Sequence, residues 1–285
     1  MNLVMTLLAR DEEDIVEENL VYHLERGVDF VVATDNNSRD DTPGILERYQ
    51  REGHVHLIRE PSTDFVQHAW RTRMARLAAT DFGADWVIDN DADEFWWPLE
   101  GGDLKDLFAA QPDHVQAVMA RKLNFVPRPG SAGPFYARML LRDNEGRNLI
   151  GRLILPKVAH RGVADVNVGT GSHRITLDGV SPKSYPAPVE ILHFSVRSYE
   201  SFEVRVRNAG EALPPQEADD PHGNVTAQYR EMFRIYQDGR LRDYYDTLVV
   251  DDEQAEEEIA AGRLVADDRL QRFFRERAAT ARQPA

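Results

Sequence analysis

The stretch ADWVIDNDADEFWWP, residues 84–98, places an apolar strand directly before a dense group of carboxylates and then returns to bulky apolar side chains. Asp89, Asp91, Asp93 and Glu94 lie within six positions, with no arginine or lysine beside them in the sequence. Alternate residues of an extended strand share a face, so the three aspartates would converge on one side. Their repulsion can be relieved by solvent, by protonation or by a divalent cation. The aromatic residues that follow favour an enclosed site, so the pattern favours a metal-linked functional site at the end of this strand over its alternative, an ordinary acidic strand end.

The residues before this strand alternate between apolar runs and helical patterns, which predicts a doubly wound, mostly parallel α/β sheet. The strands are expected at 2–9, 28–35, 54–58 and 84–89. Three helices are expected between them: one from the acids at 11–13 to Gly27, one from Thr42 to about Arg51, and one at 65–80. In the third helix, the side chains expected to point inward are Phe65, Ala69, Met74 and Leu77. Ligands of such sheets lie beyond the carboxyl ends of the strands. Asp35 ends the second strand, so we expect it to face one crevice together with the carboxylate cluster.

After Pro98 the alternation becomes less regular. We expect a helix at 102–111, a strand at 116–127, further short strands within 148–160, 162–179 and 188–196, and mostly helix from 199 onward with a frayed tail. A site for a second substrate would be built from the irregular region 125–225, because loops carry most binding chemistry.

Composition limits the classes of function. The chain has 285 residues, a formal net charge of −15 and no cysteine. This charge argues against a nucleic-acid backbone or an anionic membrane as an unaided partner, although a bridging cation or a local basic pocket would still allow phosphate binding. The lack of cysteine excludes disulfides and thiolate metal sites. No apolar stretch is long enough for a membrane span, and the N-terminus is typical of a strand rather than a signal peptide, so we expect a cytoplasmic protein. The many Arg and Ala residues and few Lys residues are typical of a GC-rich bacterial genome, so we expect a bacterial protein.

Three motifs in order resemble the GT-A glycosyltransferases of the family 2-like group. The segment LLARDEEDIVEENLVYHLERGVDFVVATDNNSRDDT (7–42) carries an acidic turn after the first strand and the pattern D-N-x-S-x-D-x-T after the second, and the strand at 84–89 leads into DADEF. The resemblance covers residues 2–97 and continues more thinly through GSHRI (171–175) and ILHFSVRSYESF (191–202). It implies a GT-A sheet with a helical C-terminal extension, in which 1–98 is the nucleotide-sugar-binding half, 99–198 the acceptor-side half and 199–285 a helical region.

The resemblance also implies an activity and roles for individual residues. The activity is metal-dependent transfer of a sugar from a UDP- or GDP-sugar to a hydroxyl acceptor. Asp35 would contact the base, Asp93 would bind the cation, and Asp91 would act on the ribose or through the metal's water. His193 would complete the metal shell, so that the ligand set is Asp91, Asp93 and His193. The further contacts to the nucleotide sugar would come from Arg10, Glu12, Asn37, Asp89 and His173.

Two departures leave alternatives open. The turn after the first strand reads Arg10-Asp11-Glu12 where the group usually has Asn-Glu. The register Asp89-Asn90-Asp91 is an alternative to Asp91-Ala92-Asp93. Chemistry favours the metal in either register, because Mn²⁺ or Mg²⁺ bridging two phosphates stabilises the charge of a departing nucleotide diphosphate. Oxygen ligands suit both ions, and a histidine among them favours Mn²⁺.

Each of these assignments has a plainer alternative. Asp35 is equally suited to cap the turn that follows it, His193 to a hydrogen bond inside the core, and His173 to the end of a turn. Trp96 and Trp97 could stack on a sugar, but tryptophan more often fills a core, and we expect this of one of them. Lys157, Arg161 and Arg174 are candidates for diphosphate contact or for the surface, and Arg71, Arg73 and Arg76 are expected on the solvated face of the helix at 65–80.

An inverting transfer needs a carboxylate that takes the proton of the acceptor hydroxyl. The group's usual downstream Glu-Asp pair is not evident in the sequence. We assign Asp165 as the catalytic base, with Asp143 and Glu190 as alternatives. A retaining transfer would need no base in that position.

Three other functions compete with glycosyl transfer. A non-catalytic nucleotide-sugar or carbohydrate-binding protein of the same fold would keep the same residues. A phosphohydrolase would use the first Asp of a strand-end DxD as nucleophile, but Phe95 stands where Thr or Val is usual, and the motif follows the fourth strand rather than the first. A sugar nucleotidyltransferase would need a Gly-rich loop after Ala9, which the sequence lacks.

Overall fold

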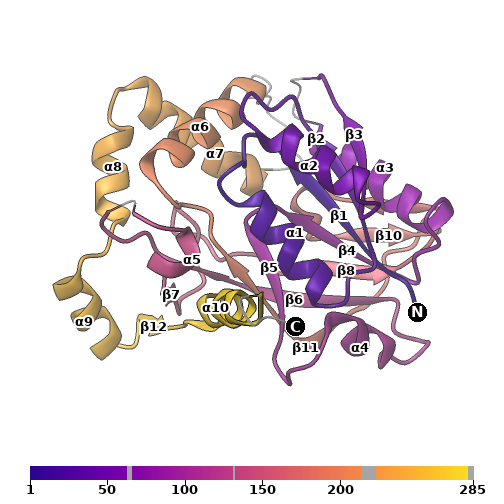
Figure 1. The fold of residues 1–285 in the computed structure, drawn as a ribbon. Helices are drawn as coiled ribbons and strands as arrows, with labels where there is room; N and C mark the ends of the chain where they lie inside the picture. The colour runs from indigo at the N-terminus through magenta and orange to yellow at the C-terminus, as the bar shows by residue number, and fades with distance from the viewer. Residues whose placement is uncertain (63–65, 131, 214–222, 282–285) are drawn as a thin grey trace.

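The computed structural model describes residues 1–62, 66–130, 132–213 and 223–281. Its centre is an eight-stranded sheet (Figure 1). Its strand order is β3-β2-β1-β4-β8-β6-β11-β5. The strands are β1 Leu3–Ala9, β2 Phe30–Asp35, β3 Val55–Arg59, β4 Trp86–Asp91, β5 Glu94–Pro98, β6 Ala117–Asn124, β8 Lys157–Arg161 and β11 Ser184–His193.

Strands β3, β2, β1 and β4 are parallel, and the register between them brings their carboxyl ends together. Ala9 of β1 pairs with Asp35 of β2, and Leu8 pairs with Asp91 of β4. The continuous apolar run of β1 is buried on both faces, which is typical of a central strand in a parallel sheet. The predicted doubly wound α/β sheet is confirmed.

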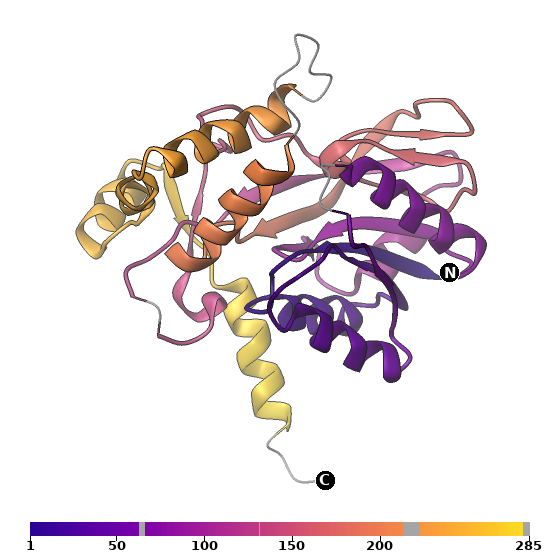
Figure 2. The ribbon, with the colours of Figure 1, turned by 90° about the horizontal axis from the view of Figure 1, so that it is seen from above.

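Helices cover both faces of the sheet. One face packs on α1 Val16–Glu25, α2 Thr42–Arg51, α4 Leu104–Ala109 and α10 Arg269–Ala281, and the other on α3 Gln67–Thr80 and the hairpin of β9 Val166–Val168 with β10 Ile175–Leu177. Figure 2 shows α10 returning to the side of α1, where Arg277 pairs with Glu25. Two layers of apolar side chains therefore fix the strand ends between them.

The chain after β11 is helical, as predicted. Helices α6 Tyr199–Ala212, α7 Gly223–Gln237 and α8 Leu241–Leu248 share a small apolar cluster of their own. The remaining elements are α5 Phe135–Arg138, the 3₁₀ turn Thr170–Ser172, α9 Asp252–Ala260, and β7 Leu141–Asp143 paired with β12 Leu264–Ala266. The end of the predicted tail, 282–285, lies outside the described residues. No helix in the described part of the chain is long and apolar enough to cross a membrane.

The two tryptophans after the carboxylates lie away from the strand ends. The chain reverses after Asp91, and β5 joins the sheet at its far edge beside β11. Trp96 is completely buried in the core, and Trp97 stacks on Tyr22 of α1. The prediction that one of them fills the core is confirmed, and neither lines the cavity described below. Strand β5 was not predicted, because its apolar run follows the acids without a recognisable turn signal.

The helix predicted at 65–80 is confirmed as α3, but its buried face differs from the prediction. Met74 and Leu77 pack inward as expected, whereas Ala69 is exposed, and Phe65 lies outside the described residues. Arg71, predicted on the solvated face, is 1% exposed. The helix is rotated so that Trp70 and Arg71 are buried and line the cavity described below, where Arg71 reaches the carboxylate at the end of β4.

The core contains a histidine that must stay neutral. His23 of α1 is fully buried; its Nε2 accepts a hydrogen bond from the backbone N–H of Trp96 (3.3 Å), and its Nδ1 donates to the carbonyl of Asn19 (2.8 Å). Burial lowers the pKa of His23 from 6.5 to about 4. The unfolded state therefore binds more protons than the folded state between these two values, so the free energy of unfolding decreases as the pH falls through that range.

We expect His23 to contribute about 3 kcal/mol of this acid destabilisation by pH 4, at about 1.4 kcal/mol per pKa unit. The measurement is urea unfolding of the wild type and of His23→Gln between pH 4 and 7. Glutamine keeps an acceptor for the Trp96 N–H but cannot take up a proton, so its pH profile should be flatter by that amount. Parallel profiles for the two proteins would contradict the prediction.

Candidate functional site

A cavity of about 320 Å³ lies beyond the carboxyl ends of β1 and β4. Its walls come from the turn after β1, the start of α3, the turn between β4 and β5, the end of β6, the loop 148–155 and the facing sides of α6 and α7. This is the position at which open α/β sheets bind their ligands. The crevice expected at these strand ends is present and the carboxylate turn faces it, but Asp35, which was also expected to face it, does not line it.

The turn between β4 and β5 presents the carboxylates to the cavity. Asn19 of α1 is buried beneath it and donates to the carbonyl oxygens of Ala92 (2.9 Å) and Glu94 (2.7 Å). The side-chain oxygen of Asn19 accepts from Asn90 at 3.1 Å. These bonds satisfy backbone carbonyl groups of the turn on the side of α1, so the side chains of its aspartates are free to face the cavity.

Basic residues from distant parts of the chain neutralise this turn. Asp91 pairs with Arg71 of α3 and with Lys157 of β8, whose Nζ lies 2.7 Å from its carboxylate. The buried Glu94 pairs with the same lysine and with Lys122 of β6 at 3.0 Å. Besides solvent, a proton or a divalent cation, the means named from the sequence, protein cations that are remote in sequence relieve the repulsion between these carboxylates.

The pKa values of the two aspartates follow from these pairs. Burial alone would raise the pKa of Asp91, but Arg71 and Lys157 outweigh it and hold that pKa below its usual range. Burial would likewise raise the pKa of Asp93, but Arg205 of α6 outweighs it and holds that pKa well below its usual range. Both groups are therefore carboxylates at neutral pH.

His193 is oriented toward Asp93. Its Nδ1 lies 2.6 Å from the side-chain oxygen of Asn124, whose amide nitrogen donates to the carbonyl of Arg147, so Nδ1 carries the proton. Nε2 then presents its lone pair to a carboxylate oxygen of Asp93 at 3.3 Å. Burial lowers the pKa of His193, and Lys122 lowers it further, which favours the neutral ring.

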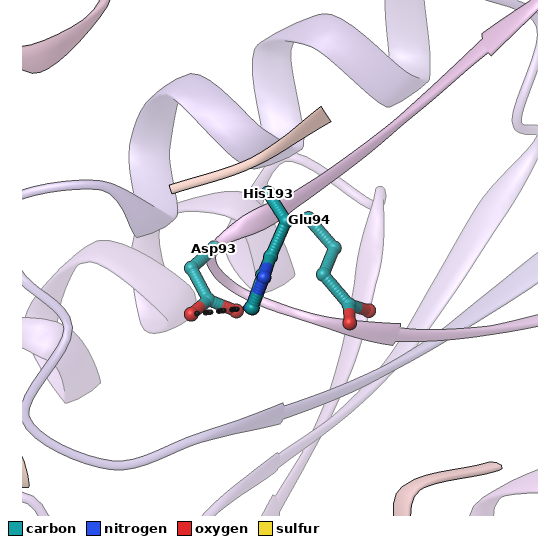
Figure 3. A group of neighbouring side chains, drawn as sticks. All are labelled: Asp93, Glu94 and His193. Carbon is teal, nitrogen blue, oxygen red and sulfur yellow. Dashed lines mark ion pairs between the residues drawn. The ribbon is translucent and has the colours of Figure 1, made fainter. Parts of the chain in front are cut away.

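Asp93 and His193 therefore direct two electron-pair donors at each other, the arrangement that a cation between them would stabilise. Figure 3 shows the imidazole of His193 between the side chains of Asp93 and Glu94, and ligand atoms of these three residues lie within 4.8 Å of one another. The predicted pairing of Asp93 with His193 is present, with Glu94 rather than Asp91 as the third member. The hydrogen bond from Nδ1 to Asn124 is the kind of outer contact that orients metal-binding histidines.

Of the other predicted contacts, Arg10, Glu12 and His173 line the cavity. The Nδ1 of His173 lies 2.9 Å from the carbonyl of Pro156, and burial lowers the pKa of this ring to about 4. Its Nε2 is therefore an acceptor at neutral pH. These three residues and the carboxylate turn lie around one space, as the prediction requires.

Asp35, Asn37 and Asp89 are placed differently. Asp35 is 3% exposed and does not line the cavity; it accepts from the backbone N–H of Ser38 at 3.4 Å, as its plainer alternative stated, and lies 3.5 Å from Arg59. Asn37 is exposed, in a left-handed conformation with φ of 56°. Asp89 is fully buried below the cavity, where it accepts from Thr6 at 2.8 Å. The structure therefore leaves these three outside the cavity wall.

Neither Asp165 nor its two alternatives as base lines the cavity. The side chain of Asp165 is 63% exposed and pairs with Arg76 of α3 at 3.1 Å. Asp143 caps the turn after β7 by accepting from backbone N–H groups, and Glu190 pairs with Arg269 at 3.2 Å. Among the described residues, the carboxylates on the cavity wall are Glu12, Asp91 and Asp93.

Two arginines that the sequence did not predict for the site are Arg205 in α6 and Arg197 just before this helix. Arg205 pairs with Asp93 and, at 3.2 Å, with Glu12, while the buried Arg197 pairs with Glu12 and, at 2.7 Å, with Asp14. A signal was present, because Arg205 lies three residues after Phe202 and next to Val206, on the apolar stripe of the helix. Arg71 occupies the same kind of position three residues before Met74. An arginine within an apolar helical stripe indicates a buried ion pair.

No family model and no curated protein sequence matches the chain. Solved structures with a similar arrangement include S. aureus TarS in complex with UDP-GlcNAc, at 15% identity, 79% coverage of this chain, 70% coverage of that chain and a TM-score of 0.41. A second S. aureus TarS structure matches 82% of this chain at 14% identity and a TM-score of 0.41, but the match spans only 44% of that TarS chain. The M. tuberculosis glucosyl-3-phosphoglycerate synthase in complex with Mn²⁺, UDP and glucosyl-3-phosphoglycerate matches 45% of each chain at 18% identity and a TM-score of 0.28. Likenesses this distant do not show membership of a family.

Proposed function

We propose that the chain is a GT-A glycosyltransferase that moves a sugar from a nucleotide-diphospho-sugar to a hydroxyl acceptor. The observation that carries this proposal is the pair of Asp93 and His193, whose electron-pair donors converge at the carboxyl end of β4 beside a basic cavity wall. In this reading, residues 1–98 hold the nucleotide sugar, 99–198 form the acceptor side, and the helical region from 199 onward closes the cavity.

A locally basic cavity supports binding of a diphosphate by a strongly acidic chain. Among the described residues, the cavity wall carries five basic side chains, from Arg10, Arg71, Lys122, Arg152 and Arg205, against the three carboxylates named above. The buried Nε atoms of Arg10 and Arg71 have no hydrogen-bond partner in the described structure. The excess of basic over acidic side chains on the wall favours an anionic ligand with several oxygen acceptors, such as a diphosphate.

The residues of the carboxylate turn fit a divalent cation of the Mn²⁺ or Mg²⁺ class. When bound, such an ion would act as a Lewis acid on the diphosphate oxygens. Asp93 and His193 would hold it, with Glu94 or Asp91 adjacent, and imidazole among oxygen ligands favours Mn²⁺. Arg205 would then direct its charge to the ligand or to Glu12, which it already contacts.

The other residues predicted to contact the nucleotide sugar fall into two groups, one on the cavity wall and one behind it. Arg10, Glu12, Asp91 and His173 would contact the nucleotide sugar directly. Asp35, Asn37 and Asp89 would act from outside the wall, by holding the turn after β2 and the end of β4. For the base, Asp165 would require a rearrangement that separates it from Arg76, so the proposal does not depend on it.

We expect a UDP- or GDP-sugar with Mn²⁺ to raise the melting temperature of the full chain. At a ligand concentration 100-fold above Kd the stabilisation is about 2.7 kcal/mol, which corresponds to about 5–10 °C for a chain of this size. The measurement is a thermal-shift panel of nucleotide sugars with Mn²⁺, beginning with UDP-GlcNAc, and with EDTA in place of the metal. If no nucleotide sugar shifts the transition under either condition, the proposed function is wrong.

The extensive pairing of the carboxylates with protein cations favours one second candidate, a protein that binds a nucleotide sugar without turnover. Mass spectrometry of the donor after incubation separates the two. Slow hydrolysis of the donor in the absence of an acceptor is expected of the transferase. Tight binding with an intact donor and no transfer to any hydroxyl compound would favour the binding protein.

A further inference from the structure

The cavity is polar on one side and apolar on the other. The polar side is formed by the strand ends, with the carboxylate turn and the basic residues that surround it. The loop 148–155, α6 and α7 contribute most of the larger apolar side chains of the wall, among them Leu149, Leu153, Leu155, Val206, Ala209 and Met232. The same elements also carry Arg152 and Arg205, and Arg205 points to the carboxylate turn, where it pairs with Asp93. A ligand that fills both sides must therefore be polar at one end and apolar at the other.

The loop holds two leucines in solvent. Leu153 is 70% exposed and Leu155 is 44% exposed. The other large apolar side chains that the described structure leaves exposed, Met1, Leu99, Val180 and Ile259, are distant from them in sequence and do not line the cavity. Two exposed leucines at the edge of one cavity are a local concentration of apolar surface, which commonly marks a binding site.

Hydrogen bonds fix the loop in this exposed conformation. The side-chain oxygen of Asn148 accepts from the backbone N–H groups of Ile150 (3.2 Å) and Arg152 (2.9 Å), and the backbone N–H of Ile154 donates to Gly146 at 2.9 Å. Tyr244 of α8 donates to the carbonyl of Leu149 at 2.6 Å. The loop is thus tied to the helical region, and its leucines remain at the cavity edge instead of collapsing into the core.

We propose that the acceptor is an amphipathic alcohol, whose hydroxyl lies near the carboxylate turn and whose aliphatic or aromatic part packs on Leu153, Leu155 and the facing sides of α6 and α7. This inference rests on the proposed function, because it assigns the diphosphate to the polar side. The acceptor is a single dissolved molecule rather than a lipid in a bilayer, because a chain with a net charge of −15 is repelled by an anionic membrane surface.

The test is a fluorescence titration of the full chain with N-phenyl-1-naphthylamine, a neutral apolar probe, followed by competition with 1-octanol. We expect a saturable rise in emission that 1-octanol reverses. The double variant Leu153→Asp with Leu155→Asp should weaken probe binding at least tenfold, because each change places a charge where the apolar part packs. Both side chains are exposed, so the melting temperature of the variant should match the wild type.

The matched control is Leu99→Asp with Val180→Asp, which adds the same charges at residues 52% and 67% exposed elsewhere on the surface. Probe binding should be unchanged in this control. Absence of saturable binding, or an equal Kd in both double variants, would overturn the inference. Cosedimentation with phosphatidylcholine–phosphatidylglycerol vesicles that depends on the two leucines would also overturn it, by making a bilayer the apolar partner.

A nucleotide-sugar thermal shift measured on the same proteins separates this inference from the proposed function. The Leu153→Asp, Leu155→Asp variant should keep the shift, because its substitutions lie on the apolar side. Loss of probe binding with the nucleotide-sugar shift intact supports the two-sided cavity. A shift without any apolar binding rejects the acceptor class alone, whereas no shift in any protein rejects the proposed function.

Discussion

The Asp93→Asn variant is expected to lose at least about 100-fold in kcat/KM for sugar transfer, together with the Mn²⁺-dependent part of the nucleotide-sugar thermal shift. Loss of one group that stabilises developing charge in an active site typically costs this much or more. Asparagine keeps the size of the side chain but removes the charge that would face His193 and a divalent ion. Arg205 retains Glu12 as a partner, so the fold should survive the change.

The matched control for Asp93→Asn is Asp178→Asn. Asp178 is exposed, does not line the cavity and has a φ of 49°, a conformation that asparagine adopts well. Activity, metal response and melting temperature of this control should equal those of the wild type. Wild-type activity in Asp93→Asn would remove the carboxylate turn from the proposed mechanism, and a Mn²⁺-dependent shift that persists would remove the metal from it.

The Lys157→Met variant is expected to lose about 3–5 kcal/mol of unfolding free energy, because it breaks buried ion pairs by removing one partner. Lys157 is 1% exposed, and it pairs with Glu94, which is completely buried, and with Asp91. Its removal leaves Glu94 with only Lys122 to balance its charge. Urea unfolding at pH 7 measures the loss, and Lys183→Met, which replaces an exposed lysine, should stay within about 0.5 kcal/mol of the wild type.

A double-mutant cycle separates the charge effect from the loss of packing. Glu94→Gln removes the charge that Lys157→Met leaves unbalanced, while Arg71 continues to compensate Asp91. The double variant should therefore be more stable than the sum of the single losses predicts, by about 2 kcal/mol. Additive losses would mean that Lys157 stabilises the core through its aliphatic stem rather than through its charge.

Local pattern was sufficient to predict the sheet and the position of the cavity. The apolar run at 2–9 and the acids that end 28–35 and 84–89 are read from neighbouring residues, and the parallel register then brings those ends together. The pairing of Asp93 with His193 came from a resemblance between motifs 100 residues apart. The strands and the position of the cavity thus rest on signals that short stretches of sequence carry, whereas the pairing needed the resemblance.

The partners of the carboxylates could not be predicted in this way. The turn is reached by Arg71 from 20 residues away, by Lys157 from 66 and by Arg205 from 112. No residue next to the aspartates in the sequence indicates these partners. The solvated face expected for Arg71 followed from the ordinary preference of arginine for water, which the ion pair with Asp91 overrides. Asp165 was assigned by its chemistry alone, and its place at the start of a hairpin beside α3 depends on tertiary packing.

The arginines at 197 and 205 tie the turn after β1 to the segment that follows β11, across more than 180 residues of chain. During translation, the nascent chain therefore completes β1 to β4 long before the guanidinium groups that balance Glu12 and Asp14 leave the ribosome. Until then the acids at the strand ends lack these basic partners, and the cavity wall formed by α6 and α7 is missing. A product that stops before residue 205 lacks the guanidinium that pairs with Asp93 and Glu12 and the helix α7 that lines the cavity, so the cavity is complete only after most of the protein has been made.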